Sequence, residues 1–157
     1  MRYRPAMADR THILDVLADR LADRGFRVVP SDDVAACFVR RTWNTNRGVL
    51  VLDVPPDVDD PAAWARTQRA RCAAAVGFRI PLVYHPGIQI VTLGPPAMTA
   101  PADAVDTIDN QWCVIQAIHV VDLDGSTVES AATWGQVISG PDQAAVASAL
   151  QEALTHP

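Results

Sequence analysis

The most informative absence in this sequence is lysine, because all 13 basic residues are arginine. The chain therefore cannot form a lysine Schiff base, supply the lysine of a phosphate-binding P-loop, or use a Ser-Lys dyad. Glutamate is almost as scarce, with Glu129 and Glu152 the only two. We attribute both biases mainly to a coding preference of the source and not to function. Whatever its cause, the absence of lysine excludes whole classes of chemistry.

Long apolar runs are also missing. The longest, residues 48–52 and 113–118, fall well short of the ~20 residues that a membrane-spanning helix needs. The basic N-terminus, residues 1–5, leads into charged sequence with no apolar stretch behind it, which argues against a signal peptide. We therefore expect no membrane association and a cytoplasmic location.

Cysteine and glycine are sparse. The three cysteines, Cys37, Cys72 and Cys113, are widely spaced, which fits neither a disulfide framework nor a zinc pattern. We expect buried free thiols in a reducing compartment. The eight glycines form no phosphate-binding loop, and Ser126 and Ser139 lack a Gly-x-Ser-x-Gly context. The sequence thus predicts no metal and no cofactor.

What is present is the composition of a folded protein. The chain has 157 residues, of which 49% are hydrophobic and 20% charged. That length is typical of one domain, and that apolar content is too high for a disordered chain. We expect a single globular domain over residues 1–157, with an N-terminal arm at residues 1–10. Residues 94–110, rich in proline and alanine, are expected to form a long surface loop.

Helix signals occur three times. The first helix begins at Thr11 or Asp9 and ends at Gly25, with apolar residues at helical spacing between them. The second begins at Asp60 and Pro61, a strong capping pair, and ends at Gly77. The third is predicted to begin at residues 139–141.

Strand signals fill most of the remaining chain. They occur at residues 26–29, 35–42, 48–54, 79–84, 88–93, 111–121 and 127–137. The resulting order is α–βββ–α–ββ–ββ–α, and short turns join most neighbouring strands, including a predicted type II turn at residues 85–87. Since only one connection offers a helix between successive strands, we predict the α+β class, with a mostly antiparallel or mixed sheet of about six to seven strands and three helices.

Charge is divided unevenly along the chain. Residues 1–50 hold nine arginines and six aspartates, whereas residues 101–157 hold eight acids and no base. Such asymmetry suggests complementary surfaces, within an oligomer or towards a partner. The alternative is that folding mixes the segments and leaves no patch.

One candidate ligand site combines arginines and amides with an aromatic ring, a mixture suited to clamping phosphates and stacking bases. Its members are Arg40, Arg41, Trp43, Asn44, Asn46 and Arg47, to which the second helix adds Arg66 and Arg69. The alternative is an exposed hairpin loop with solvated arginines. The net charge of −5 disfavours sequence-independent binding to nucleic acid.

Acidic residues gather near Asp53, at the end of a predicted strand. The order helix, three strands, helix, strand, with Asp53 ending the third strand, resembles the restriction-endonuclease-like nucleases. That family's motif also needs a lysine, which this chain lacks, so no catalytic residue is carried over. The order α–βββ–α–ββ–α is similar to that of small secretion chaperones, from which the extra hairpin departs. Helix capping explains Asp60 better than a metal site does.

His119 is the one histidine that falls within a predicted strand. Simple alternation places it on the face of Cys113, Ile115 and Ala117, and a hydrogen-bonded, partly buried histidine is the expected outcome. Whether it meets a cysteine in the fold is left open.

Taken together, these patterns favour a non-enzymatic binding, adaptor or assembly protein that acts through protein surfaces, with a protein partner or a homo-oligomer expected. The rival hypothesis is a phosphate- or nucleic-acid-binding module, or a nuclease-like enzyme, that uses the arginine-rich loop over residues 40–47 and Asp53.

Overall fold

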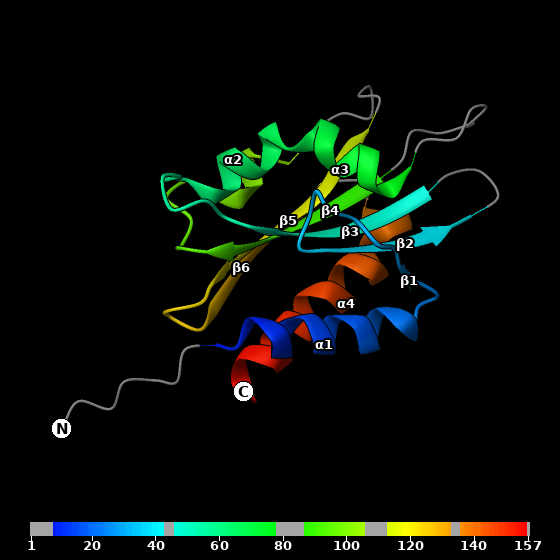
Figure 1. Cartoon of the computed structure of the whole chain (residues 1–157), viewed down its shortest axis with the longest axis horizontal. Coiled ribbons are helices and arrows are strands. Elements are labelled where there is room, and N and C mark those ends of the chain that lie inside the picture. Colours follow the sequence, from blue (N-terminus) through cyan, green and yellow to red (C-terminus); the bar gives the residue numbers. More distant parts are fainter. Residues whose placement is uncertain (1–7, 43–45, 78–86, 106–112, 133–135, 157) are drawn as a thin grey trace.

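The computed structural model describes residues 8–42, 46–77, 87–105, 113–132 and 136–156, with side chains described from residue 142 onward in the last helix. A six-stranded mixed sheet separates two helical layers. Helices α2 (Pro61–Thr67) and α3 (Arg69–Val76) cover one face (Figure 1). Helices α1 (Arg10–Ala22) and α4 (Gln136–Thr155) cover the other. The predicted α+β class with a mixed sheet is confirmed.

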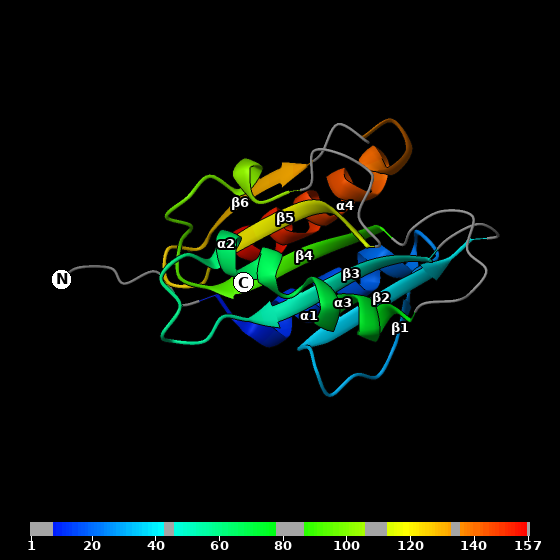
Figure 2. The same cartoon turned by 90° about the horizontal axis from the view of Figure 1, so that it is seen from above.

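The strands lie side by side in chain order, as the view from above shows (Figure 2). They are β1 (Arg27–Val28), β2 (Ala36–Arg41), β3 (Asn46–Asp53), β4 (Gly87–Gly94), β5 (Val114–Asp122) and β6 (Thr127–Ala132). The pairs β1–β2, β2–β3 and β5–β6 are antiparallel, whereas β3–β4 and β4–β5 are parallel. The helices α2 and α3 make the crossover that the first parallel pair requires.

The capping signals predicted from sequence are found at both early helices. Asp9 caps α1 by accepting a hydrogen bond from the Thr11 amide at 2.9 Å, and Asp60 caps α2 through the Ala63 amide. The predicted second helix is divided at Gln68, so the described chain has four α-helices rather than three. The Thr67 hydroxyl donates a hydrogen bond to the carbonyl of Trp64. The Gln68 amide, which would bind that carbonyl in a continuous α-helix, donates to the carbonyl of Ala65 instead.

Two predicted connections differ from the structure. The segment after β4 was expected to be a plain surface loop, but it carries the chain back to a second parallel strand and includes the short helix η1 (Pro101–Asp103). Its residues 106–110 lie outside the described residues, as does the predicted strand at 79–84. In the sheet β4 lies between β3 and β5. The sequence instead predicted a hairpin between this strand and residues 79–84.

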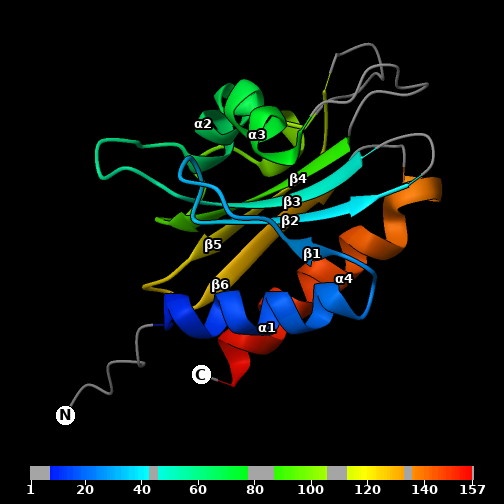
Figure 3. The same ribbon diagram turned by 45° about the vertical axis from the view of Figure 1, so that its right-hand side comes forward.

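The start of the last helix was also predicted wrongly. We expected a strand to residue 137 and a helix from residue 139, but β6 ends at Ala132 and α4 begins at Gln136. Likewise Arg10, assigned to an N-terminal arm, is the first residue of α1. Arg10 enters the helix because Asp9 caps it. Residues 137 and 138 are helical despite their strand preference, and α4 packs beside α1 (Figure 3).

Each face of the sheet has its own apolar core. Leu50, Ile88 and Ile118 pack beneath α2 and α3, while Leu17, Val49 and Leu150 pack between the sheet, α1 and α4. The three cysteines are free and buried in the first of these cores, as predicted. Across the described residues, none of the helices combines the length and apolar character needed to cross a membrane.

Candidate functional site

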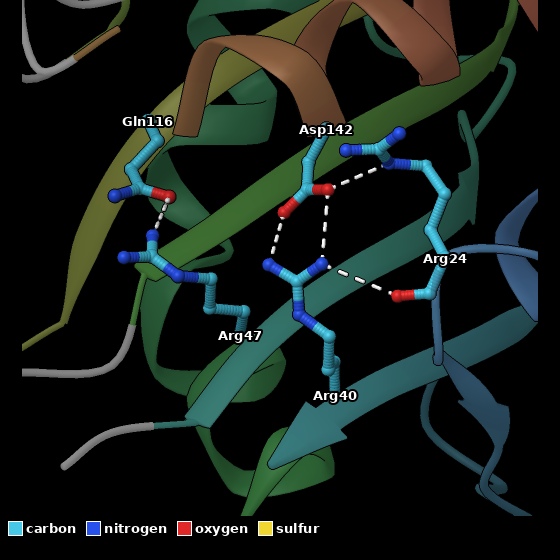
Figure 4. A network of polar contacts seen from close by, with 5 residues as sticks. All are labelled: Arg24, Arg40, Arg47, Gln116 and Asp142. Atoms are coloured by element: carbon cyan, nitrogen blue, oxygen red, sulfur yellow. Dashed lines mark hydrogen bonds and ion pairs between the residues drawn. The ribbon is translucent and has the colours of Figure 1, made fainter. Parts of the chain in front are cut away.

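The arginine pair Arg40 and Arg47 lies on the face that α4 covers. The two residues are opposite each other on β2 and β3, and the Arg40 guanidinium binds the carboxylate of Asp142 on α4 through both terminal nitrogens (Figure 4). Arg24, which follows α1, donates to the same carboxylate at 2.8 Å. Arg40 also stacks on Phe26, 4.9 Å from the ring centre. The charge of Arg40 is thus compensated inside the protein by the carboxylate of Asp142.

Arg47 points to β5 rather than to α4. Its guanidinium donates to the side-chain oxygen of Gln116 at 3.2 Å (Figure 4). Gln116 stands where the pairing of β4 with β5 shifts, between the partners Ile88–Ile115 and Gln89–Ala117. The side chain of a residue at such a bulge is turned away from the regular ladder, and here it meets the arginine.

The other predicted arginines lie on the opposite face. Arg66 on α2 donates to the carbonyl of Ala104 at 3.2 Å, and Arg69 on α3 donates to that of Cys113 at 3.3 Å. The sheet therefore separates Arg66 and Arg69 from Arg40 and Arg47, and the four do not form one surface. Each donates to the body of the protein.

The remaining predicted loop residues have three different outcomes. Asn46 is buried and donates to the Gly77 carbonyl at 2.9 Å, which makes it a structural residue. Arg41 is exposed at the end of β2. Trp43 and Asn44 lie outside the described residues.

Asp53 is also occupied. It accepts two hydrogen bonds from Arg10 at 2.8 Å each, with both side chains about half exposed. Asp60 caps α2, and a hydrogen bond from Thr99 helps to lower the pKa of its carboxyl. Among the described residues no cluster of three or more histidines, cysteines or acids is suited to a metal ion. The acidic segment is thus explained by capping and one surface ion pair.

His119 is hydrogen-bonded, as expected from sequence, but it is fully rather than partly buried, and its two partners, Ser130 and Gln89, were not foreseen. This buried side chain contacts the Ser130 hydroxyl at 2.7 Å through Nδ1 and the side-chain oxygen of Gln89 at 3.0 Å through Nε2. Burial lowers the pKa of His119 to about 4, so the ring is neutral at pH 7. Because the Gln89 oxygen only accepts, Nε2 carries the proton, and Ser130 donates to Nδ1.

The face predicted for His119 was wrong. It was expected beside Cys113 and Ile115, but it lies opposite Ser130 and Val91, and Val91 belongs to the core of α1 and α4. The bulge at Gln116 inserts one extra residue and reverses the alternation beyond it. Since all three cysteines belong to the other core, His119 does not meet one.

The trio of His119, Ser130 and Gln89 is arranged like a catalytic triad but lacks the electrostatics of one. In a serine hydrolase a buried carboxylate stabilises the imidazolium that forms when the serine loses its proton. Here the third member, Gln89, is uncharged, and burial lowers the pKa of the imidazole. The trio links β4, β5 and β6 through two side-chain hydrogen bonds.

Ser130 and His119 border a hollow of about 320 Å³ between β6 and α4. Most of its other lining side chains are small: Ala131, Ala132, Ala144 and Ala147, together with Gln143. Strand β6 is the last strand of the sheet, and no described strand pairs with its outer side. Three of its residues, Thr127, Glu129 and Ser130, are exposed. We call β6 together with this hollow the β6 edge.

Four acidic residues of the segment 101–157 fall into two pairs that differ in their partners. Asp142 and Glu152 on α4 bind arginines of the N-terminal segment, Glu152 through Arg20 at 2.7 Å. Glu129 on β6 and Asp124 in the turn before it have no basic partner within ion-pair distance among the described residues. Arginines of the N-terminal segment thus neutralise the first pair of acids, whereas the negative charge of the second pair remains beside the β6 edge.

Comparison with models of protein families, with curated proteins and with solved structures gives no match for this chain. The site is therefore interpreted from its own geometry.

Proposed function

We propose that this protein is a non-enzymatic binding protein that takes up an extended segment of a partner polypeptide at the β6 edge. The observation that carries the proposal is the combination of a terminal strand, three of whose residues are exposed, with an alanine-lined hollow beside it. A terminal strand presents unpaired backbone donors and acceptors. An added strand satisfies them, and adjacent pockets for its side chains give specificity.

The state of the reactive side chains supports a non-enzymatic role. Burial raises the pKa of Cys37 to about 11 and that of Cys72 to about 12, so both thiols stay protonated and unreactive at pH 7. His119 is neutral with no carboxylate beside it. Nucleophilic catalysis needs an activated nucleophile and a supported base, and none of these residues provides the pair.

Anion binding, for a phosphate group or a nucleic acid, is a second candidate with one observation in its favour. Two guanidinium groups, those of Arg24 and Arg40, share the single carboxylate of Asp142 (Figure 4), and Arg47 lies opposite Arg40 on the neighbouring strand. The local excess of positive charge would attract an anion. Retention on heparin that weakens in the Arg47→Ala variant, with Arg27→Ala as the exposed control, would favour it over strand addition.

The proposal is tested by filling the hollow. Ala147→Leu places a larger side chain in it, while Ser148→Leu adds a similar side chain one residue along α4, at an exposed position outside the lining. Wild type and both variants are screened for binding to an array of short extended peptides, and β6 amide exchange is followed with the best binder. We expect Ala147→Leu to lose binding and Ser148→Leu to keep it, with the β6 amides protected in the complex.

Two results would overturn the proposal. One is an array without any binder. The other is a set of binders that Ala147→Leu retains at full affinity and that leave the exchange of the β6 amides unchanged.

A further inference from the structure

The pairing of β6 with β5 fixes which way each β6 side chain points. Ser130 lies opposite His119 and Val128 opposite Val121, which places both on the face of α4. Glu129 lies opposite Val120, whose side chain belongs to the core beneath α2 and α3. Strand β6 therefore shows small side chains and the hollow on one face, and an acid on the other.

A strand added to the outer side of β6 would follow the same alternation, since successive side chains point to opposite faces. On the α4 face its side chains would enter the hollow lined by Ala132, Ala144 and Ala147. The alanines leave room for small or medium apolar groups, and none of the seven lining residues, which include Ser130, Gln143 and the neutral His119, carries a charge to pair with a charged side chain. On the opposite face its side chains would lie beside Glu129.

The charge at this edge selects the sign of the partner. Residues 101–157 contain no arginine and no lysine, and Glu129 and Asp124 have no basic partner among the described residues. The carboxylate of Asp122 is engaged in the turn, where it accepts hydrogen bonds from the backbone amides of Asp124 and Gly125. Opposite charges directly across a strand pair stabilise it, whereas like charges oppose it.

The same rule disfavours a second copy of this chain as the occupant. Antiparallel pairing of β6 with β6 of another copy would bring acid towards acid, and neither strand carries a base. A partner of complementary charge avoids this repulsion.

We propose that the β6 edge binds an extended polypeptide segment in which basic residues alternate with small or medium apolar ones. The basic residues pair with Glu129 and Asp124, and the apolar residues fill the hollow. This inference rests on the proposed function and adds the chemistry of the partner to it.

The test compares a short peptide alternating arginine and valine with one alternating glutamate and valine, by fluorescence anisotropy at low and physiological salt. We expect the basic peptide to bind at least about tenfold more tightly, and its affinity to fall as salt screens the charges. The double variant Glu129→Arg/Asp124→Arg should lose roughly tenfold for the basic peptide and gain for the acidic one. Ala147→Leu should weaken both.

The matched control is Asp15→Arg/Asp19→Arg, which makes the same change in net charge on exposed positions of α1. It should leave the preference intact. An equal loss of the basic peptide in the two double variants would overturn the inference, because attraction would then depend on net charge alone. Unchanged binding in Glu129→Arg/Asp124→Arg would overturn it as well, because these acids would then play no part. A concentration-dependent dimer that Ala147→Leu dissolves would overturn it in favour of self-association.

The two proposals fail in different ways. If peptides bind at the hollow, as judged by their loss in Ala147→Leu, but without preference for a basic pattern, the proposed function stands and the present inference is wrong. If no peptide binds at the hollow, both are wrong. Circular dichroism of every variant confirms that a loss of binding is not a loss of fold.

Discussion

Arg40 and Asp142 are 102 residues apart in the chain, and they form a two-point contact between β2 and α4 in which Nη1 of Arg40 lies 3.1 Å from Oδ1 of Asp142. The Asp142 side chain is only 5% exposed, and Arg24 shares it. Removing one member of such a buried group leaves the others charged and without compensation.

Replacing Asp142 with asparagine should therefore destabilise the protein by about 3 kcal/mol, because Arg24 and Arg40 lose their shared counter-charge. Urea unfolding followed by circular dichroism measures this. Glu152→Gln is the matched control, since Glu152 binds Arg20 in an exposed pair and such pairs contribute little. Equal losses in the two variants would show that Asp142 is no more important than a surface acid.

Stability should also depend on pH through His119. Its pKa is about 4 in the folded protein because burial disfavours the charged ring, whereas an unfolded histidine titrates near 6.5. The unfolded state therefore binds the proton more readily, and the stability associated with the neutral ring is complete above about pH 6.5 and falls as the pH drops towards 4.

The difference between wild type and His119→Gln isolates this effect from the titration of the carboxylates. The thermal midpoint of wild type should fall more steeply between about pH 6.5 and 4.5 than that of the variant, with a contribution of a few kcal/mol at the acid end. Parallel pH curves for the two proteins would contradict the assignment of a neutral, buried ring.

Gly48 on β3 should not tolerate even alanine. A Cβ there would overlap with Cγ2 of Val76 on α3, because it would lie closer than two non-bonded carbon atoms approach. We expect Gly48→Ala to cost roughly 1–3 kcal/mol through overpacking. Adding Val76→Ala removes the clashing methyl groups, so the double variant should lose less than the sum of the two single losses. Strict additivity in denaturant unfolding would rule out direct contact between α3 and this glycine.

The three thiols should be unreactive in the folded protein. Cys37, Cys72 and Cys113 are all buried, and burial raises the pKa of Cys37 to about 11 and that of Cys72 to about 12. A disulfide exchange reagent should label none of them within minutes at pH 7.5 and all of them in denaturant. Rapid labelling of one thiol in native buffer would reveal an opening of the core beneath α2 and α3.

The elements that sequence predicted well are those fixed by local chemistry. Asp9, Asp60 and Gly77 act at helix ends through their own side chain or backbone conformation, and the structure places them there. The division of the second helix at Gln68 depends on a competing hydrogen bond from the Thr67 hydroxyl, and α4 begins three residues before the predicted start. Local propensity does not contain that information.

The candidate site was harder to predict because it depends on strand register. Once the turn at Asp122–Gly125 is recognised, the pairing of β5 with β6 places His119 opposite Ser130, so this contact was within reach of the sequence. The face on which the pair lies was not, because the bulge at Gln116 occurs in the pairing of β5 with the parallel strand β4, and that pairing was not predicted. The arginines of residues 40–47 attracted interest by composition, yet Asp142 and Gln116, which hold two of them, come from the other end of the chain.

The packing of α1 against α4 has a consequence for synthesis of the protein. The apolar stripe of α1, formed by Ile13, Leu17 and Leu21, is completely buried, and much of what covers it is the final helix. During translation the apolar stripe of α1 therefore stays uncovered by α4 until α4 has left the ribosome. Nascent chains stalled before residue 142 should accordingly recruit holdase chaperones to α1, and synthesis of α4 should end that association.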